Sequence, residues 1–175
     1  MKKLHLFMFV GLLFLFLQCK QEEKDYSFKK AKLNSSAIEL IKKYIKYSNL
    51  PKGINEILIY KYISNSTDIW VINASKLTNA GIDDSTNKKD YVCFFDGFYV
   101  FINPELKDQM FIEDGIIKIP ESKIEIIDDN DVPYTYDIIS SWEFEIYYNK
   151  LINFKCQFCT LTENQIKDIE SIIFY

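Results

Sequence analysis

The stretch YVCFFDGFYVFIN, residues 91–103, contains two apolar runs separated by Asp96-Gly97. An Asp-Gly pair between two such runs is the strongest short-range sequence signal of a β-hairpin with a two-residue turn. Residues 91–95 and 98–103 are therefore predicted to pair as antiparallel strands, and Pro104 is predicted to end the hairpin. The rest of the expected sheet is assigned outward from this hairpin.

Short strands are predicted on both sides of the hairpin. Residues 56–63 and 69–74 precede it and are rich in Ile, Tyr, Val and Trp. No helical segment of crossover length separates consecutive strands, which favours antiparallel over parallel pairing. Further strands are predicted after the hairpin at residues 110–112, 116–119 and 123–127, with Gly115 and Pro120 between them.

A second hairpin is predicted near the C-terminus, between residues 141–147 and residues 151–158. In the first of these strands, an apolar side chain at every second position alternates with a glutamate or a tyrosine. A shift of one residue would turn every side chain to the other face, so the loop length matters. A three-residue loop at 148–150 matches the apolar faces and pairs Ile146 with Ile152, Phe144 with Phe154, Trp142 with Cys156, and Glu143 with Lys155.

Two helices complete the predicted fold. Ser36 and Glu39 have the spacing of a capping box, and apolar residues recur at helical spacing after them, so a helix is predicted over 36–49. Thr162 and Gln165 predict the cap of a short closing helix with Ile166, Ile169 and Ile173 facing inward. The expected fold class is α+β: a curved antiparallel β-meander with an N-terminal helix packed on it and a short C-terminal helix.

The N-terminus has the pattern of an export signal. Lys2 and Lys3 precede a twelve-residue apolar run, 6–17, which is shorter than the roughly 18 residues that a membrane-spanning helix needs. The segment Leu15-Phe16-Leu17-Gln18-Cys19 resembles the cleavage site of bacterial lipoproteins. That resemblance implies removal of residues 1–18, acylation of Cys19, including palmitate, and anchoring in the outer membrane of the cell envelope.

The residues after the cysteine refine this expectation. Lys20-Gln21-Glu22-Glu23 is similar to the surface-export signal of lipoproteins from Bacteroidota, which favours a surface-exposed position and leaves a periplasmic position as the alternative. Residues 19–33 are interpreted as an acylated tether, and residues 34–175 as a single α+β domain. Asp84-Ser85-Thr86 is similar to the short O-glycosylation motif of exported Bacteroidota proteins.

The composition excludes several classes of function. All 21 basic residues are lysines, and the chain without residues 1–18 has 19 lysines against 25 acidic residues, a net charge of −6. An acidic chain without arginine is not expected to bind nucleic acid. The only histidine, His5, lies in the signal, so catalysis and metal binding that need histidine are excluded from the mature chain. We therefore predict that the protein is not an enzyme and needs no cofactor or metal.

Three cysteines remain after the anchor. Cys156 and Cys159 form a CxxC motif, but no βαβ unit follows it, as a thioredoxin-like site would require. Export permits a disulfide, and pairing of Cys93 with either Cys156 or Cys159 would tie the two hairpins together. The alternative is that all three are free thiols.

Other candidate site residues have simpler structural interpretations. Glu143 and Glu145 share a strand face and could in principle act as the carboxylate pair of a hydrolase, but opposed charges on a solvent face are the simpler explanation. The acidic loop 128–131 lacks the spacing of a calcium-binding loop. Trp70 and Trp142 are candidates for stacking on a ligand, although aromatic residues at strand spacing usually belong to the core.

These observations favour a membrane-anchored envelope lipoprotein with a protein-binding role, as an accessory subunit or as an immunity protein that neutralises an exported toxin. An acidic domain on a lipid anchor suits a basic protein partner. The first alternative is a surface lipoprotein that binds glycans through exposed aromatic residues. The second alternative is a hydrolase that uses the carboxylates of Glu143 and Glu145.

Overall fold

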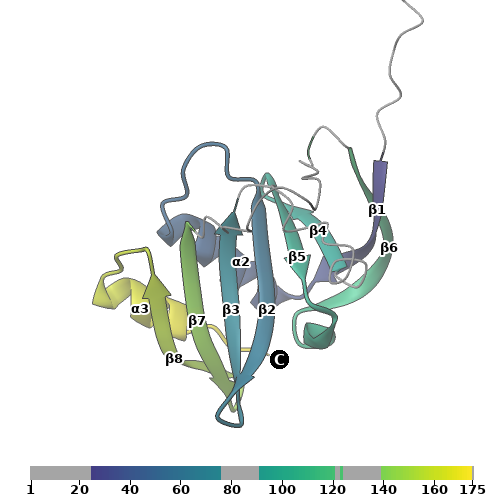
Figure 1. Ribbon diagram of the computed structural model, residues 1–175. Helices are drawn as coiled ribbons and strands as arrows, with labels where there is room; N and C mark the ends of the chain where they lie inside the picture. The colour runs from purple at the N-terminus through teal and green to yellow at the C-terminus, as the bar shows by residue number, and fades with distance from the viewer. Residues whose placement is uncertain (1–24, 76–90, 121–122, 124–138, 175) are drawn as a thin grey trace, which may run out of the picture.

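A computed structural model describes residues 25–75, 91–120, 123 and 139–174. Eight strands form one sheet in the order β6-β1-β4-β5-β2-β3-β7-β8 (Figure 1). The strands are β1 (Asp25–Leu33), β2 (Glu56–Ser64), β3 (Thr67–Ser75), β4 (Tyr91–Phe95), β5 (Phe98–Ile102), β6 (Phe111–Pro120), β7 (Ser140–Tyr147) and β8 (Lys150–Gln157). The helices are α2 (Ser35–Tyr47), α3 (Glu163–Glu170) and the short 3-10 helix η2 (Pro104–Leu106).

The sheet is mixed. Strand β1 is parallel to β4, and β2 is parallel to β5, whereas the other neighbouring pairs are antiparallel. The prediction of an α+β fold is confirmed in its broad form, but the antiparallel meander is wrong. The error arises because strands that are distant in the sequence are adjacent in the sheet. Strand β1 lies between β4 and β6, and β5 pairs with β2.

The first strand occupies residues that the sequence interpretation assigned to a tether. Strand β1 pairs with β6 from Asp25↔Pro120 to Leu33↔Phe111. A register shift lies where Asp114 and Gly115 oppose Lys30, and Gly115 has a φ of +97°, which favours glycine. Residues 25–33 therefore belong to the sheet, and the predicted strands 110–112 and 116–119 form parts of one bulged strand, β6. Most of the predicted strand at 123–127 lies outside the described residues.

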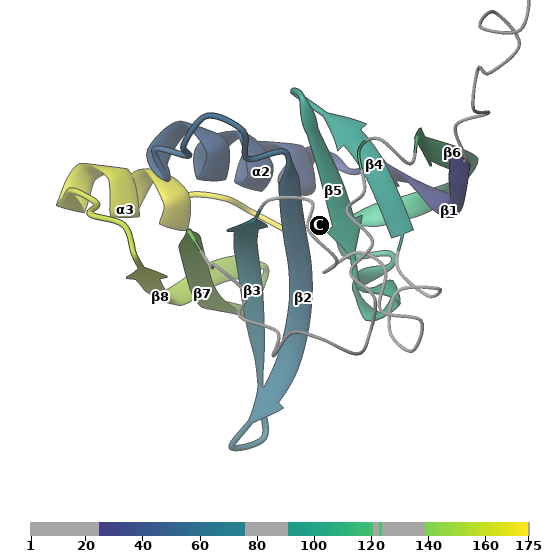
Figure 2. The same ribbon diagram turned by 45° about the horizontal axis from the view of Figure 1, so that its top comes forward.

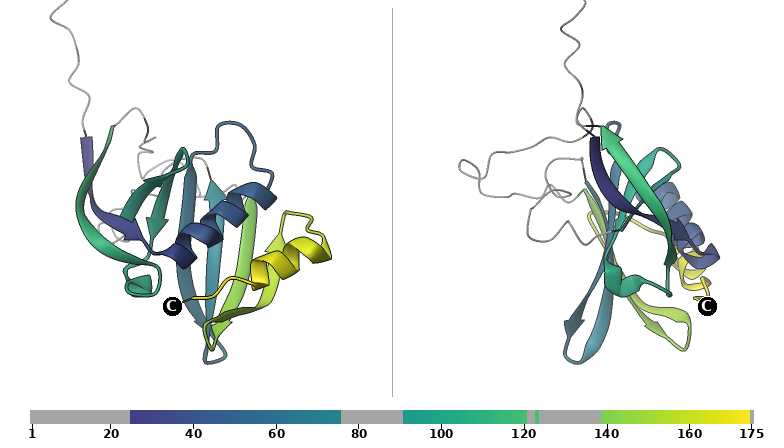
Figure 3. Two further views of the ribbon diagram at one scale, coloured as in Figure 1. Left: turned by 180° about the vertical axis from the view of Figure 1, so that it is seen from behind. Right: turned by 90° about the vertical axis from the view of Figure 1, so that its right-hand side faces the viewer.

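Both helices cover the same face of the sheet (Figures 2 and 3). In α2, Leu40, Ile41 and Tyr44 are fully buried. They pack with alternate residues of the central strands, which point to this face because side chains in a strand alternate. The sheet residues of this main core include Ile57, Ile59, Trp70, Ile72, Val100, Ile102, Trp142 and Phe144.

A second core lies on the opposite face of the sheet. It consists of Val92, Phe101 and Ile119, which are buried, with partly buried side chains around them. The Phe28 and Phe101 rings meet edge to face at a centroid distance of 5.8 Å. Burial on this face explains why β1 alternates, with Tyr26 and Phe28 inward and Ser27 and Lys29 exposed. The partly buried members are Tyr26, Phe28, Leu58, Tyr99 and Ile117.

Each hairpin turns through residues with positive φ. The Asp96-Gly97 hairpin is confirmed, with φ values of 49° and 87° at the two turn residues. Strands β7 and β8 are joined by the two-residue turn Tyr148-Asn149, so the predicted three-residue loop and the Ile146–Ile152 pair are wrong. A bulge at Asn153, whose φ is 52°, shifts the register. The predicted pairs Trp142–Cys156 and Glu143–Lys155 therefore occur in the structure.

The helix termini differ in how well the sequence predicted them. The Thr162–Gln165 capping box of α3 is confirmed, and Ile169 is buried, but Ile172 is buried where Ile173 was expected. At α2 the N-cap is Asn34 and not Ser36. The Asn34 side chain accepts a hydrogen bond of 2.8 Å from the Ala37 backbone N–H and donates one of 2.6 Å to the Gln109 carbonyl. Ser36 instead donates to the Ile173 carbonyl at 2.6 Å.

We expect Asn34→Ala to lower the free energy of unfolding by about 1–2 kcal/mol, because it removes both the cap and the hydrogen bond to Gln109. Urea unfolding followed by circular dichroism measures the change. Asn34→Asp, which keeps the capping acceptor and loses the donor, should fall between Asn34→Ala and the wild-type protein. An unchanged stability in Asn34→Ala would show that another residue caps the helix.

Candidate functional site

Three of the sequence-predicted sites lie outside the described residues. They are the anchor Cys19, the glycosylation-like motif 84–86 and the acidic loop 128–131. The remaining candidates are the three other cysteines, the two tryptophans and the two glutamates of β7, and the structure places all of these.

The cysteines pair within the CxxC motif. A disulfide joins Cys156, near the end of β8, to Cys159, whose Cα lies 5.9 Å away. Cys93 is a free thiol in the main core, where burial raises its pKa to about 12. Neither arrangement considered from the sequence, a disulfide between the hairpins or three free thiols, occurs in the structure. The observed bridge closes a loop of four residues, and the intervening Phe158 is exposed with a φ of 59°.

The two tryptophans are core residues. Trp142 is fully buried and packs edge to face against Tyr44 and Phe154, at centroid distances of 5.0 and 5.2 Å. Trp70 is 3% exposed and stacks on Phe144 at 6.1 Å. Neither ring presents a face to a ligand from solvent, so the prediction that these tryptophans stack on a ligand is wrong.

Glu143 and Glu145 lie on the face of β7 opposite the helices and are hydrogen-bonded to amides of β8. Gln157 donates to Glu143 at 3.3 Å, and Asn153 donates to Glu145 at 3.0 Å. These contacts fit a cross-strand pairing role, but the partners are amides and not the opposite charges that the sequence suggested. Within the described ranges, no group of three or more His, Cys, Asp or Glu side chains is arranged to hold a metal ion.

A polar cluster joins the two helices. Tyr47 of α2 donates a hydrogen bond of 2.7 Å to Asp168 of α3, and the Lys43 ammonium group lies 3.2 Å from the same carboxylate. The Tyr47 hydrogen bond, followed by the contacts with Lys43, lowers the pKa of Asp168. Lys43 also pairs with Glu39 at 3.0 Å. Every member of this cluster is engaged with another, so it serves to hold α3 against α2.

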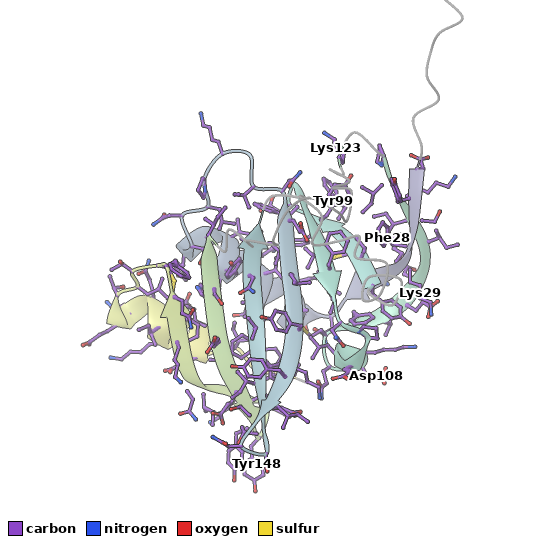
Figure 4. The ribbon with its side chains drawn as sticks, in the orientation of Figure 1. Phe28, Lys29, Tyr99, Asp108, Lys123 and Tyr148 are labelled. Carbon is purple, nitrogen blue, oxygen red and sulfur yellow. A yellow bond between two sulfur atoms is a disulfide. The ribbon has the colours of Figure 1, made fainter. Side chains whose placement is uncertain are left out.

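Large apolar side chains are exposed where two hairpins turn. At the β7–β8 turn, Tyr147 is 60% and Tyr148 82% exposed, and their rings meet edge to face at 4.3 Å. Near the β2–β3 turn, Ile63 is 75% and Tyr62 42% exposed. We call these four residues the hairpin-end residues. Both turns lie at the same end of the sheet, with Tyr148 at the lower edge of the view in Figure 4.

The hairpin-end residues could not be selected from the sequence, because Tyr62, Ile63 and Tyr147 fit the pattern of predicted strands and Tyr148 was placed in the predicted loop 148–150. One signal was present in the sequence: Tyr148 lies in the predicted loop, where polar residues, Gly and Pro predominate. In the structure it occupies the turn with a φ of 46°. Its ring contacts that of Tyr147, which is itself exposed, so neither ring is held in a core. Tyr148 is therefore a candidate contact residue.

Comparison of the chain with protein-family models, with curated proteins and with solved structures finds no match. In the part of the chain that the structure describes, neither helix has the length and apolar character needed to cross a membrane.

We expect the three cysteines to differ in reactivity in the full chain carrying Cys19→Ala. Under native conditions at pH 7, an alkylating reagent should modify neither the disulfide-bonded pair nor the buried Cys93. Mild reduction should add two modified thiols, and unfolding should add the third. Counting modified cysteines by mass spectrometry tests this order, and native labelling of Cys93 would contradict it.

Proposed function

We propose that the chain is a lipid-anchored protein of a bacterial cell envelope that binds a protein partner through its hairpin-end residues. The observation that carries the proposal is the exposed pair Tyr147 and Tyr148. Tyrosine is enriched at protein interfaces because its large ring contributes apolar contact and its hydroxyl group contributes a hydrogen bond. Exposed tyrosines in contact at a turn therefore make a suitable anchor for a partner.

The position of the hairpin-end residues suits this role. Acylation at Cys19 would leave five residues, 20–24, before β1 begins at Asp25. Strand β1 begins at the upper end of the molecule in Figure 1, and the β2–β3 and β7–β8 turns lie at the lower end. A second view keeps both turns at this end and the start of β1 at the opposite end (Figure 3). An anchor at the N-terminus would thus leave the hairpin-end residues pointing away from the membrane.

The charge of the chain favours a basic partner. The mature chain would carry a net charge of −6, and opposite charge on a partner accelerates association and suppresses binding of acidic competitors. An accessory subunit of an envelope complex and an immunity protein against a basic toxin both fit this description. We propose an outer-membrane location, on the surface or facing the periplasm, with palmitate among the acyl groups of Cys19.

Glycan binding is the second candidate function, and the exposed rings of Tyr147 and Tyr148 are the observation that favours it. The tryptophans that first suggested it are buried. Hydrolysis by Glu143 and Glu145 receives less support, because each carboxylate is hydrogen-bonded to an amide side chain of β8.

We expect Cys19→Ala to abolish acylation and to release the chain from the membrane fraction or leave it with its signal attached. Acyl chains contribute about 0.8 kcal/mol for each buried CH₂ group, so their loss removes the anchor. Labelling of growing cells with radioactive palmitate measures the effect. Cys93→Ala is the matched control and should keep full labelling, whereas continued labelling of Cys19→Ala would refute the proposed anchor.

We expect Tyr147→Thr combined with Tyr148→Asn to reduce partner binding at least tenfold, since truncating a central interface tyrosine costs about 2 kcal/mol or more. Asn tolerates the positive φ of residue 148, so the turn should be retained. The measurement is crosslinking in intact cells, followed by purification through a C-terminal tag and quantitative mass spectrometry. Phe94→Ala, at an exposed aromatic residue of β4, is the control.

Two results would count against this proposal. Equal capture of one stoichiometric partner by the double variant and by the wild-type protein would remove the hairpin-end residues from the interface. The absence of any enriched protein, together with a glycan-array signal that the double variant loses, would replace protein binding by glycan binding.

A further inference from the structure

One small region of the fold differs in charge from the rest. It comprises the paired segments Asp25–Lys29 of β1 and Ile116–Pro120 of β6, together with Lys123, and we call it the upper ribbon. Its charged side chains are Lys29, Lys118, Lys123 and Asp25, all exposed, which gives it a net charge of +2. The mature chain carries −6, so the rest of that chain carries −8. Figure 4 shows Lys29 and Lys123 on this side of the molecule.

The upper ribbon has one buried face and one outward face. Tyr26, Phe28, Ile117 and Ile119 join the second core. Side chains alternate along each strand, so the cross-strand pairs Ser27↔Lys118 and Lys29↔Ile116 share the other face. Lys29, Lys118 and Ser27 are exposed, and Ile116 is 72% exposed. Lysines around an exposed isoleucine fit the boundary of a bilayer, where the apolar side chain enters and the ammonium groups reach phosphate.

Two acidic residues of β6 that adjoin the upper ribbon have partners of their own. Asp114, at the bulge of β6, pairs with Lys30 at 3.1 Å. Glu113 accepts a hydrogen bond of 3.1 Å from the Tyr91 hydroxyl group. The Lys29 ammonium group lies 5.4 Å from the centre of the Tyr91 ring. Asp25, at the start of the strand, is the one acidic residue within the upper ribbon itself.

The length of the segment between Cys19 and β1 determines which surface this face can reach. Residues 20–24 separate Cys19 from Asp25, and fully extended they allow the two Cα atoms to be about 20 Å apart. From Asp25 onward the chain is held by hydrogen bonds in the sheet. The outward face begins two residues later, at Ser27, so it lies within reach of the surface in which the acyl chains would be embedded.

We propose that the upper ribbon docks on the anionic headgroups of the membrane that holds the Cys19 lipids. This docking rests on the anchoring in the proposed function and adds an orientation to it. The short tether supplies a high local concentration of headgroup phosphate, so a weak contact suffices to orient the domain. The attraction between the lysines of the upper ribbon and the headgroup phosphates acts within about 10 Å at 0.1 M salt. The hairpin-end residues then face away from the membrane on a domain that does not tumble freely.

The test uses the full acylated chain in vesicles of phosphatidylethanolamine and phosphatidylglycerol that contain a lipid with a nitroxide-labelled headgroup. A fluorophore is attached at Ser27→Cys in the upper ribbon or at Thr67→Cys beside the β2–β3 turn. Cys93 is buried with a raised pKa, and Cys156 and Cys159 are disulfide-bonded, so the introduced thiol is the reactive one among residues 25–174 that the structure describes. Mass spectrometry of the same sample reports acylation of Cys19.

A flexible insertion separates docking from simple proximity. Twenty Gly and Ser residues placed between Glu23 and Lys24 raise the root-mean-square reach of the tether to about 28 Å. In this lengthened chain we expect quenching at Ser27→Cys to remain at least about threefold stronger than at Thr67→Cys, because the lysines hold the upper ribbon on the headgroups. Lys29→Glu with Lys118→Glu should abolish that difference, and so should high salt.

The matched control is Lys42→Glu with Lys167→Glu, which reverses two exposed lysines on the helices and should keep the difference. Cys93 protection in every variant reports that the domain is folded. Equal quenching at both positions in the lengthened chain with its native lysines would overturn the docking and leave the anchoring intact. Quenching that survives Lys29→Glu with Lys118→Glu would also overturn it. A chain without acylation would overturn the anchoring and the docking together.

Discussion

Tyr44 is the residue on which the main core depends. Its hydroxyl group donates a hydrogen bond of 2.7 Å to the backbone carbonyl of Ser140, and its ring packs against Trp142. Burial raises the pKa of Tyr44 above its ordinary value, so the phenol remains protonated and able to donate. Trp142 in turn contacts Phe154 of β8. One tyrosine therefore connects α2 to both strands of the C-terminal hairpin and satisfies a buried carbonyl that would otherwise be costly.

The local features of this fold could be predicted from the sequence because their causes are local. The Asp96-Gly97 turn and the Thr162–Gln165 capping box depend on residues within a few positions of one another, and both occur in the structure. The cap of α2 shows the limit of such reasoning. Asn34 and Ser36 are both good capping residues, and the choice depends on Gln109 and Ile173, which lie far along the chain.

The order of the strands could not be predicted, because it depends on contacts between distant segments. Tyr26, Ser27, Phe28 and Lys29 alternate as a strand should, but three lysines within residues 29–32 made the segment resemble a solvated tether. The second core, formed with Phe101 and Ile119, explains why this segment is a strand, and Ala31, which is buried in the main core, secures its other face. The register of β7 and β8 likewise depends on a bulge at Asn153. The sequence did not indicate this bulge, because a three-residue loop without a bulge also matches the apolar faces.

The candidate site was predictable to a smaller extent. The aromatic residues that sequence patterns select are those at regular strand spacing, and Trp70 and Trp142 are buried for that reason. The residues that contact solvent, such as Tyr148, break the pattern instead of following it. The pairing of Cys93, Cys156 and Cys159 could not be predicted from their spacing, because export is compatible both with a disulfide and with free thiols.

The pairing of β1 with β6 has a consequence for how the protein reaches its location. If the proposed export begins at the N-terminus, β1 emerges early, and the partner segment that ends at Pro120 emerges some ninety residues later. Closing so large a loop is entropically slow, and strand pairing across it delays folding. The local hairpins do not have to wait for β6, but the edge of the sheet that β1 and β6 form is completed only after Pro120 has emerged.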